Sequence, residues 1–125
     1  MRKKVSPGEV NSGNSSMKKY TYVVLTRPVT GKEEEYNDWY DNRHLADVVA
    51  VPGFTGAERY RAASGVSGVG DPQMPYLALY TIETDNLQGT LDAMMARSGT
   101  DAMPISDALD TSSVYAVIYE AMDNG

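Results

Sequence analysis

Residues 33–54, EEEYNDWYDNRHLADVVAVPGF, predict a helix that runs directly into a strand. Three glutamates occupy the first helical turn, where the helix macrodipole favours negative charge. Pro52 and Gly53 then favour a break and a tight turn, so we expect the helix to cover residues 33–50. Between these ends, large and ionisable side chains recur at spacings of three and four, which places them along one broad helix face: Tyr36, Trp39, Tyr40, Arg43, His44, Asp47 and Val48.

The segments on either side of this helix complete a recognisable order of elements. Residues 20–29, 76–83 and 112–122 are rich in β-branched and aromatic residues and are predicted strands, and residues 54–62 form a weaker one. A second helix is predicted over residues 85–99, with Asp85 as its N-cap and Gly99 at its end. The order β-α-β-β-α-β is the ferredoxin-like arrangement, an α+β fold in which two helices cover one face of a four-stranded antiparallel sheet.

The predicted strands carry apolar side chains on both faces. In residues 76–83, tyrosine, alanine and isoleucine face one way and Leu77 and Leu79 face the other, so both faces of the strand carry large apolar side chains. Two helices can cover only one face of the sheet, and a large uncovered apolar face usually marks an interface. We therefore expect a homodimer in which two protomers pack sheet on sheet.

Composition excludes several classes of partner. The net charge of −6 provides no electrostatic footprint for nucleic acid or an anionic membrane, and no segment approaches the roughly 18 apolar residues of a membrane span. One histidine with scattered carboxylates does not make a usual transition-metal site, so we expect no metal and no cofactor. The chain contains no cysteine, which excludes disulfides and thiol catalysis and is compatible with the expected cytoplasmic location.

The first 16 residues differ from the rest of the chain. They are polar and rich in serine, asparagine and glycine, so they cannot bury enough apolar surface to become ordered. We expect residues 1–16 to be a disordered tail and residues 17–125 to form one ferredoxin-like domain.

Two motifs resemble a known family. The segment WYDNRHLADVVAVPGF (39–54), followed by PYLALYTIE (75–83), resembles the EthD-like branch of the dimeric α+β barrel superfamily. The resemblance extends over residues 20–122 and implies a small homodimer with a pocket between the sheet and the helices of each protomer. Relatives include cofactor-free isomerases, lyases, cyclases and monooxygenases that act on small aromatic, quinonoid or lactone compounds. The resemblance therefore implies the fold more closely than the reaction.

His44 and Tyr40 are the candidate catalytic residues. The unperturbed pKa of histidine lies near neutral pH, so His44 is suited to general acid/base catalysis. Tyr36, Tyr40 and His44 are each four residues apart and form a ladder on one side of the helix, from which Tyr40 can donate a hydrogen bond to a substrate oxygen. The alternative is a structural histidine near the helix C-terminus, where the dipole favours its charged form. The resemblance supports the catalytic role, because the matching histidine is a recurrent pocket residue.

Four further side chains on this helix are candidates for binding substrate: Tyr36, Trp39, Arg43 and Asp47. Arg43 could clamp a substrate carboxylate, but an ordinary surface ion pair with Asp47 explains the same spacing and is the interpretation that we favour. Asp47 could instead orient His44, and Asp41 could play the same part. Most of the strand tyrosines are expected to serve packing.

These observations lead to one leading hypothesis and two alternatives. The leading hypothesis is a small cofactor-independent enzyme that carries out isomerase, lyase or cyclase chemistry by proton transfer on a small aromatic, lactone or polyketide-like compound. The first alternative is a dimeric protein of the same fold that binds small molecules or responds to stress without turnover. The second alternative is a cofactor-free monooxygenase.

Overall fold

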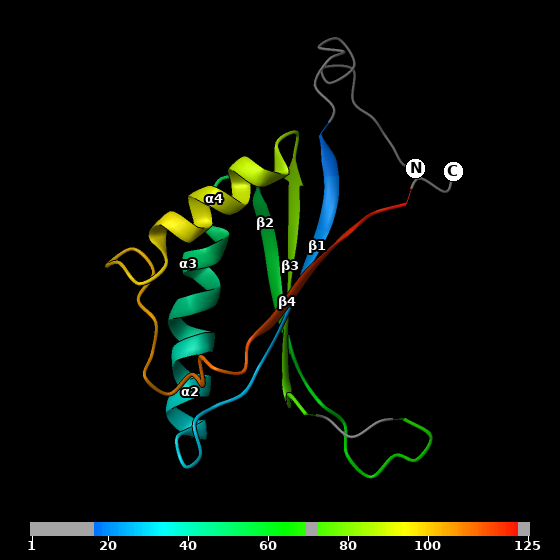
Figure 1. The fold of residues 1–125 in the computed structure, drawn as a ribbon, viewed down its shortest axis with the longest axis vertical. Helices are drawn as coiled ribbons and strands as arrows, with labels where there is room; N and C mark the ends of the chain where they lie inside the picture. The colour runs from blue at the N-terminus through cyan, green and yellow to red at the C-terminus, as the bar shows by residue number, and fades with distance from the viewer. Residues whose placement is uncertain (1–16, 70–72, 123–125) are drawn as a thin grey trace.

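Four antiparallel strands form one sheet, and the helices pack against one of its faces (Figure 1). The computed structural model describes residues 17–69 and 73–122, so the predicted tail lies outside the described residues. The strand order is β2-β3-β1-β4, which brings the first and third strands to the centre of the sheet. The elements, in chain order, are β1 (Lys18–Thr26), α2 (Glu33–Trp39), the π-helical turn η1 (Tyr40–His44), α3 (Leu45–Val49), β2 (Phe54–Arg61), β3 (Tyr76–Thr84), α4 (Leu87–Arg97) and β4 (Tyr115–Glu120).

This architecture confirms the ferredoxin-like α+β fold predicted from the sequence. All four predicted strands and both predicted helices are present, and every pairing in the sheet is antiparallel. The boundaries differ by a few residues, and the last strand is shorter than predicted. No helix within residues 17–69 and 73–122 is both long and apolar enough to cross a membrane.

The first helix is not a regular α-helix throughout. Segments α2, η1 and α3 follow one another without a break, and the backbone N–H of Leu45 donates to the carbonyl oxygen of Tyr40, five residues earlier. Hydrogen bonds of this span define a π-helical turn, which accommodates one residue more than an α-helical turn. The spacing of side chains in the sequence did not predict this turn, because spacings of three and four suit an α-helix equally well.

The predicted cap of the second helix is wrong by one residue. Asn86, not Asp85, is the N-cap of α4, and its side-chain oxygen accepts a hydrogen bond of 3.0 Å from the backbone N–H of Gly89. An N-cap side chain accepts from the N–H two or three residues later, and Asn86 has this relationship to Gly89. Gly99 follows the helix with φ +84°, a conformation that glycine adopts without strain, as predicted for the end of this helix.

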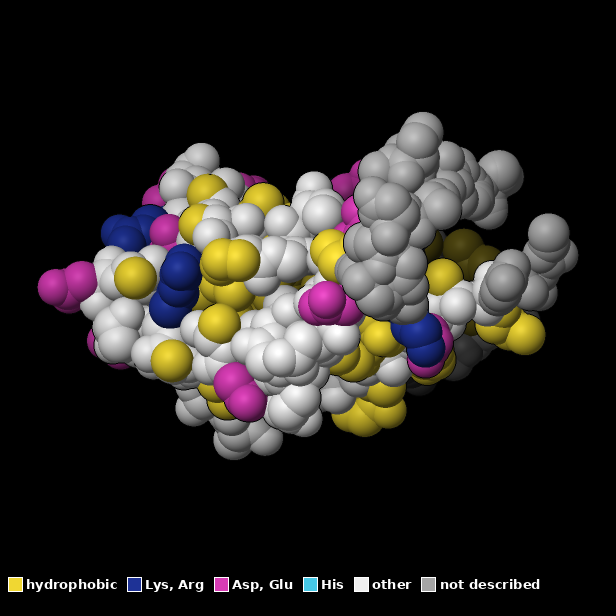
Figure 2. Space-filling model, turned by 90° about the horizontal axis from the view of Figure 1, so that it is seen from above, with side chains coloured by type: hydrophobic (Ala, Val, Ile, Leu, Met, Phe, Trp, Pro, Cys, Tyr) yellow, Lys and Arg dark blue, Asp and Glu magenta, His cyan; other side chains and the backbone are white. Residues whose placement is uncertain are grey.

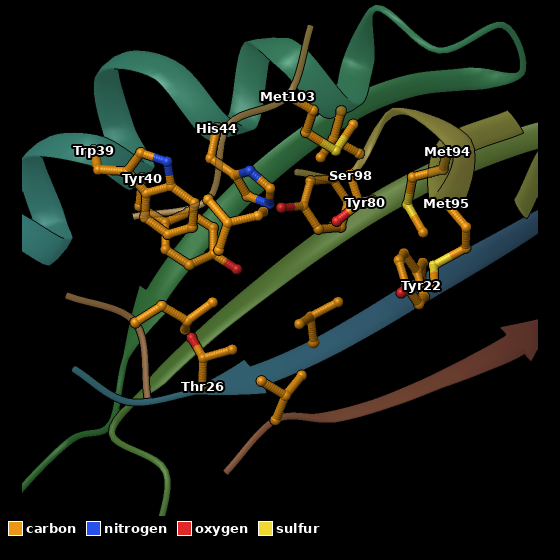
Figure 3. A pocket seen from close by; sticks show the side chains of 15 residues that line it. Tyr22, Thr26, Trp39, Tyr40, His44, Tyr80, Met94, Met95, Ser98 and Met103 are labelled. Atoms are coloured by element: carbon orange, nitrogen blue, oxygen red, sulfur yellow. The ribbon is translucent and has the colours of Figure 1, made fainter. Parts of the chain in front are cut away.

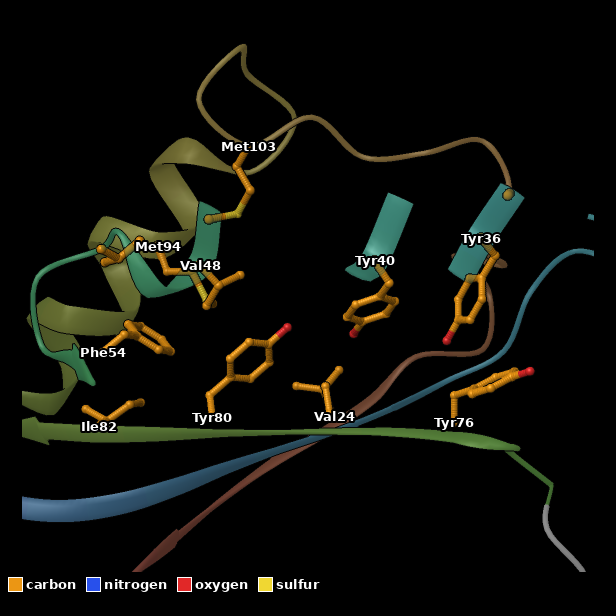
Figure 4. Packing of buried hydrophobic residues seen from close by; sticks show 13 residues of the cluster. Val24, Tyr36, Tyr40, Val48, Phe54, Tyr76, Tyr80, Ile82, Met94 and Met103 are labelled. Atoms are coloured by element: carbon orange, nitrogen blue, oxygen red, sulfur yellow. The ribbon is translucent and has the colours of Figure 1, made fainter. Parts of the chain in front are cut away.

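The core lies between the sheet and the helices (Figure 4). On β3, Tyr76, Ala78, Tyr80 and Ile82 are buried against the helices, which confirms the alternation predicted for this strand. The helix contributes Tyr36, Tyr40 and Val48 from above, and Phe54 and Met94 close one end of the layer.

The opposite face of the sheet carries apolar side chains that no helix covers. The register aligns one row across all four strands: Tyr60, Leu77, Leu25 and Tyr115. The two outer tyrosines are exposed and the two leucines are half-buried. Seen from above, hydrophobic side chains reach the surface on the helix side and also on the opposite side (Figure 2). The pattern of two apolar sheet faces is therefore present in the folded protein.

Candidate functional site

A cavity of about 160 Å³ lies between the sheet and the helices, where the resemblance places a pocket. Its walls come from β1, β3, the first helix, the end of α4 and the segment that follows α4 (Figure 3). The lining includes Tyr22, Trp39, Tyr40, His44, Tyr80 and Met94. Three of the residues predicted from the sequence, Trp39, Tyr40 and His44, thus reach one cavity.

His44 is held in place by aromatic packing. Its ring stacks on Trp39 with centroids 4.5 Å apart and an interplanar angle of 27°, and it meets the edge of Tyr40 at 5.2 Å. The indole N–H of Trp39 donates to the carbonyl oxygen of Pro104 at 3.0 Å, which fixes the stacking partner. The Tyr36 ring lies 5.5 Å from that of Tyr40, so the predicted ladder of Tyr36, Tyr40 and His44 is present.

The environment of His44 favours the neutral imidazole. Burial lowers the pKa of His44 to about 4, and the nearby carboxylate of Asp47 raises it by a smaller amount. The Nδ1 atom of His44 is buried and has no hydrogen-bond partner among the described residues. At neutral pH the ring is therefore uncharged, which argues against a structural histidine stabilised in its charged form by the helix dipole.

Two buried tyrosines complete the polar part of the cavity. Burial raises the pKa of Tyr40 to about 12, and burial together with the neighbouring Tyr40 phenol raises the pKa of Tyr80. Their hydroxyl groups point toward one another in Figure 4 and interact closely enough to raise the pKa of Tyr80, but no contact of the Tyr80 hydroxyl within the described residues has the geometry of a hydrogen bond. Both phenols remain protonated at neutral pH and can donate hydrogen bonds.

Tyr36 lies behind this site. Its side chain is fully buried, packs against Tyr40 and exchanges a hydrogen bond with the hydroxyl of Thr26. It does not belong to the described lining of the cavity. Tyr36 therefore packs behind Tyr40. Its side chain has no surface exposed to the cavity, so in this arrangement Tyr36 does not make the substrate contact expected from the sequence.

Arg43 and Asp47 form the surface ion pair that the sequence analysis favours. The guanidinium Nε of Arg43 lies 2.7 Å from a carboxylate oxygen of Asp47, and a second nitrogen donates to the backbone carbonyl of Asp101 at 2.7 Å. Asp41 instead pairs with Arg59 at 2.8 Å. Neither carboxylate bonds to His44 Nδ1, and neither Arg43 nor Asp47 is in the described lining.

The sequence analysis missed two residues of this region, Tyr80 and Arg59. The alternation in β3 placed Tyr80 on the helix-facing side, but nothing distinguished it from the other strand tyrosines. The Arg59 guanidinium lies 4.4 Å from the ring centroid of Tyr40 and also faces the rings of Tyr36 and Tyr76, a cation–π arrangement. Arg59 and Arg61 both lie on the helix-facing side of β2, and nothing in the sequence distinguished the first from the second.

Comparison with known proteins identifies the fold. No model of a known protein family matches the chain, and no curated protein matches it. A solved structure of an ethyl tert-butyl ether d (EthD) family protein from Bacillus halodurans C-125 superposes with a TM-score of 0.56, covering 86% of this chain and all of the other. The two sequences are 20% identical, a level at which the similarity concerns the fold. The chain therefore has the fold of an EthD family protein, as the resemblance of residues 39–54 and 75–83 implies.

Proposed function

We propose that the chain is a small cofactor-independent enzyme that transfers protons on a small aromatic, lactone or polyketide-like compound. One observation carries the proposal: two buried polar atoms without a hydrogen-bond partner among residues 17–69 and 73–122, His44 Nδ1 and Tyr80 Oη, belong to residues that line the same cavity. Buried polar atoms are nearly always hydrogen-bonded, so each exception calls for an explanation. A bound ligand that supplies the missing partners is such an explanation.

The proposed roles follow from the protonation states. The neutral imidazole of His44 takes a proton from a carbon next to a carbonyl group, and the electron pair of the broken C–H bond moves onto the carbonyl oxygen. The protonated hydroxyls of Tyr40 and Tyr80 donate hydrogen bonds to this oxygen as it gains negative charge. Return of the proton to a different carbon completes an isomerisation, and loss of a leaving group from the next carbon completes an elimination.

A binding protein without turnover is the second candidate. The observation that favours it is the lowered pKa of His44, since a group with a pKa of about 4 is a weak base at neutral pH. In this case the imidazole and the tyrosine hydroxyls orient a ligand and transfer no proton.

A homodimer through the sheet faces forms part of the proposal. Its support is the apolar row of Tyr60, Leu77, Leu25 and Tyr115, which lies on the face opposite the helices. Packing a second protomer against this row would remove apolar area from water on both sides.

The reaction can be tested with an unsaturated lactone. α-Angelica lactone has one small ring and an acidic C–H beside its carbonyl, and its isomerisation to the conjugated lactone is followed by ultraviolet absorbance. We expect the full chain to accelerate this conversion and His44→Phe to slow it by about 100-fold or more. Tyr119→Phe is a matched control, because Tyr119 is exposed. Equal rates for His44→Phe and the unmodified protein would contradict the proposed base, and no acceleration would favour the binding protein.

A further inference from the structure

We propose that the cavity selects neutral compounds of one ring that carry a hydroxyl or carbonyl oxygen on the ring, binds phenols best among them, and rejects carboxylates of the same size. This inference names the ligand class of the site on which the proposed function rests. Three properties of the cavity support it: the absence of charge from its described lining, its volume, and the identity of its unpartnered polar groups.

The first property is the absence of charge. None of the described residues that line the cavity is an aspartate, glutamate, lysine or arginine, and the only ionisable base among them is His44. The guanidinium of Arg59 lies beyond the Tyr40 ring, where it donates to Asp41 and Asn37 at 2.8 Å each. A carboxylate in the cavity would therefore lose its water without gaining a cationic partner, which is strongly unfavourable.

The second property is size and shape. A cavity of about 160 Å³ is comparable to the dry cavity of about 150 Å³ that holds benzene in another protein. The stacked pair of Trp39 and His44 supplies a flat aromatic wall, and the thioethers of Met94 and Met103 supply an adaptable apolar one. One ring fills this space, and a fused system of several rings would extend past lining side chains that are themselves exposed, such as Met95 and Val114.

The third property is the pair of polar groups without partners. In Figure 3 the imidazole of His44 and the hydroxyl of Tyr80 extend toward one another from the helix and from the sheet. His44 Nδ1 and Tyr80 Oη are closed off in the structure as it stands, so a ring hydroxyl reaches them once one of the two side chains turns toward the cavity. It can then donate to one group and accept from the other. A ring hydroxyl can form a hydrogen bond with either tautomer of the neutral imidazole, because a hydroxyl is both donor and acceptor. A carbonyl oxygen can only accept, so it serves only the tautomer whose N–H faces it.

The test compares three probes of similar size. Phenol, toluene and benzoate are titrated at pH 7 against the full chain, with excitation at 295 nm to follow Trp39, the single tryptophan, in the cavity wall. We expect phenol to bind at least tenfold more tightly than toluene, and benzoate to bind more weakly than toluene. Benzoate affinity equal to that of phenol, or phenol affinity no higher than that of toluene, would overturn the inference.

Two variants separate the hydroxyl contacts from the apolar ones. Tyr80→Phe removes an unpartnered hydroxyl and keeps the ring, so the variant should fold, and His44→Phe keeps an aromatic ring against Trp39. Each should lower phenol affinity to the level of toluene and leave toluene affinity within twofold. Tyr119→Phe, at an exposed position, should change neither affinity. Unchanged phenol affinity in both variants would refute the proposed contacts.

The outcomes also distinguish this inference from the proposed function. If phenol binds with the expected selectivity but the lactone is not isomerised, the ligand class stands and the proposed reaction fails. If the lactone is isomerised but benzoate binds as well as phenol, the reaction stands and the ligand class fails.

Discussion

The imidazole of His44 stacks on the indole of Trp39, five residues earlier in the chain, with ring centroids 4.5 Å apart. In a regular α-helix, residues five apart differ by about 140° around the axis and do not face each other. The π-helical turn Tyr40–His44 is wider by one residue and brings the two rings onto one side. The turn therefore places the only histidine of the chain against the wall of the cavity.

Burial of His44 predicts a specific loss of stability in acid. Its pKa is about 4 in the folded protein and about 6.5 in an unfolded chain, so the unfolded state binds more protons between these values. Stability is thus full above about pH 6.5 and falls as the pH drops toward 4, by about 3 kcal/mol for a shift of this size. The free energy of unfolding is measured with urea at pH 7 and pH 4 for the unmodified protein and for His44→Phe. The contribution of His44 is the extra loss of stability in the unmodified protein.

The comparison with His44→Phe serves as its own control. The other titrating groups are present in both proteins and cancel, and Asp110, whose pKa is lowered to about 2 mainly by hydrogen bonds from Ser112 and Arg27, titrates below this range. If both proteins lose the same stability between pH 7 and pH 4, the imidazole is not desolvated in solution.

Two buried tyrosines should respond in opposite ways to loss of their hydroxyls. Tyr36→Phe breaks the hydrogen bond to Thr26 and leaves a buried threonine hydroxyl without this partner, which should cost about 1–2 kcal/mol. Tyr80→Phe removes a hydroxyl that has no partner, so stability should stay within about 0.5 kcal/mol or rise. Urea unfolding at pH 7 measures both. A larger loss for Tyr80→Phe than for Tyr36→Phe would mean that the Tyr80 hydroxyl is satisfied in solution.

The cap of α4 can be tested with neighbouring substitutions. Asn86→Ala removes the side-chain oxygen that accepts from the N–H of Gly89 and should destabilise the protein by about 1 kcal/mol. Asp85→Ala, one residue earlier, removes no capping hydrogen bond and should change stability by less than half as much. Thermal unfolding of the two variants, measured side by side, checks the order. The reverse order would restore the cap predicted from the sequence.

The proposed dimer predicts that one charge on the outer sheet face is disruptive. Tyr115→Lys places an ammonium group in the row that also contains Leu25 and Leu77. We expect the unmodified chain to sediment as a dimer at micromolar concentration and Tyr115→Lys to sediment as a monomer. Ala96→Lys, at an exposed position on α4, should remain dimeric. A monomeric unmodified chain would contradict a dimer through this face.

The sequence predicted an element well where its pattern of side chains fits only one kind of secondary structure. The alternation in residues 76–83 gave the buried face of β3 because side chains in a strand point to opposite sides in turn. The π-helical turn was missed because Tyr36, Tyr40 and His44 fit an α-helix as well. The proposed role of Tyr80 was missed because whether a hydroxyl has a hydrogen-bond partner depends on residues that are distant in the chain. The choice between Asp85 and Asn86 failed because either side chain can cap a helix.

The π-helical turn affects the position of the His44 ring but is not needed for the helix to pack against the sheet. Tyr40 and Val48 are both buried against the sheet, and they lie eight residues apart. A helix shortened by one residue within Tyr40–His44 would place them seven apart, close to two full α-helical turns, and would keep both on the same face. The extra residue is therefore dispensable for packing, and a deletion of Asn42 should yield a folded domain in which the imidazole no longer lies five residues after its aromatic partner. The spacing between the two stacked rings is therefore set by the turn and is independent of the core that the helix covers.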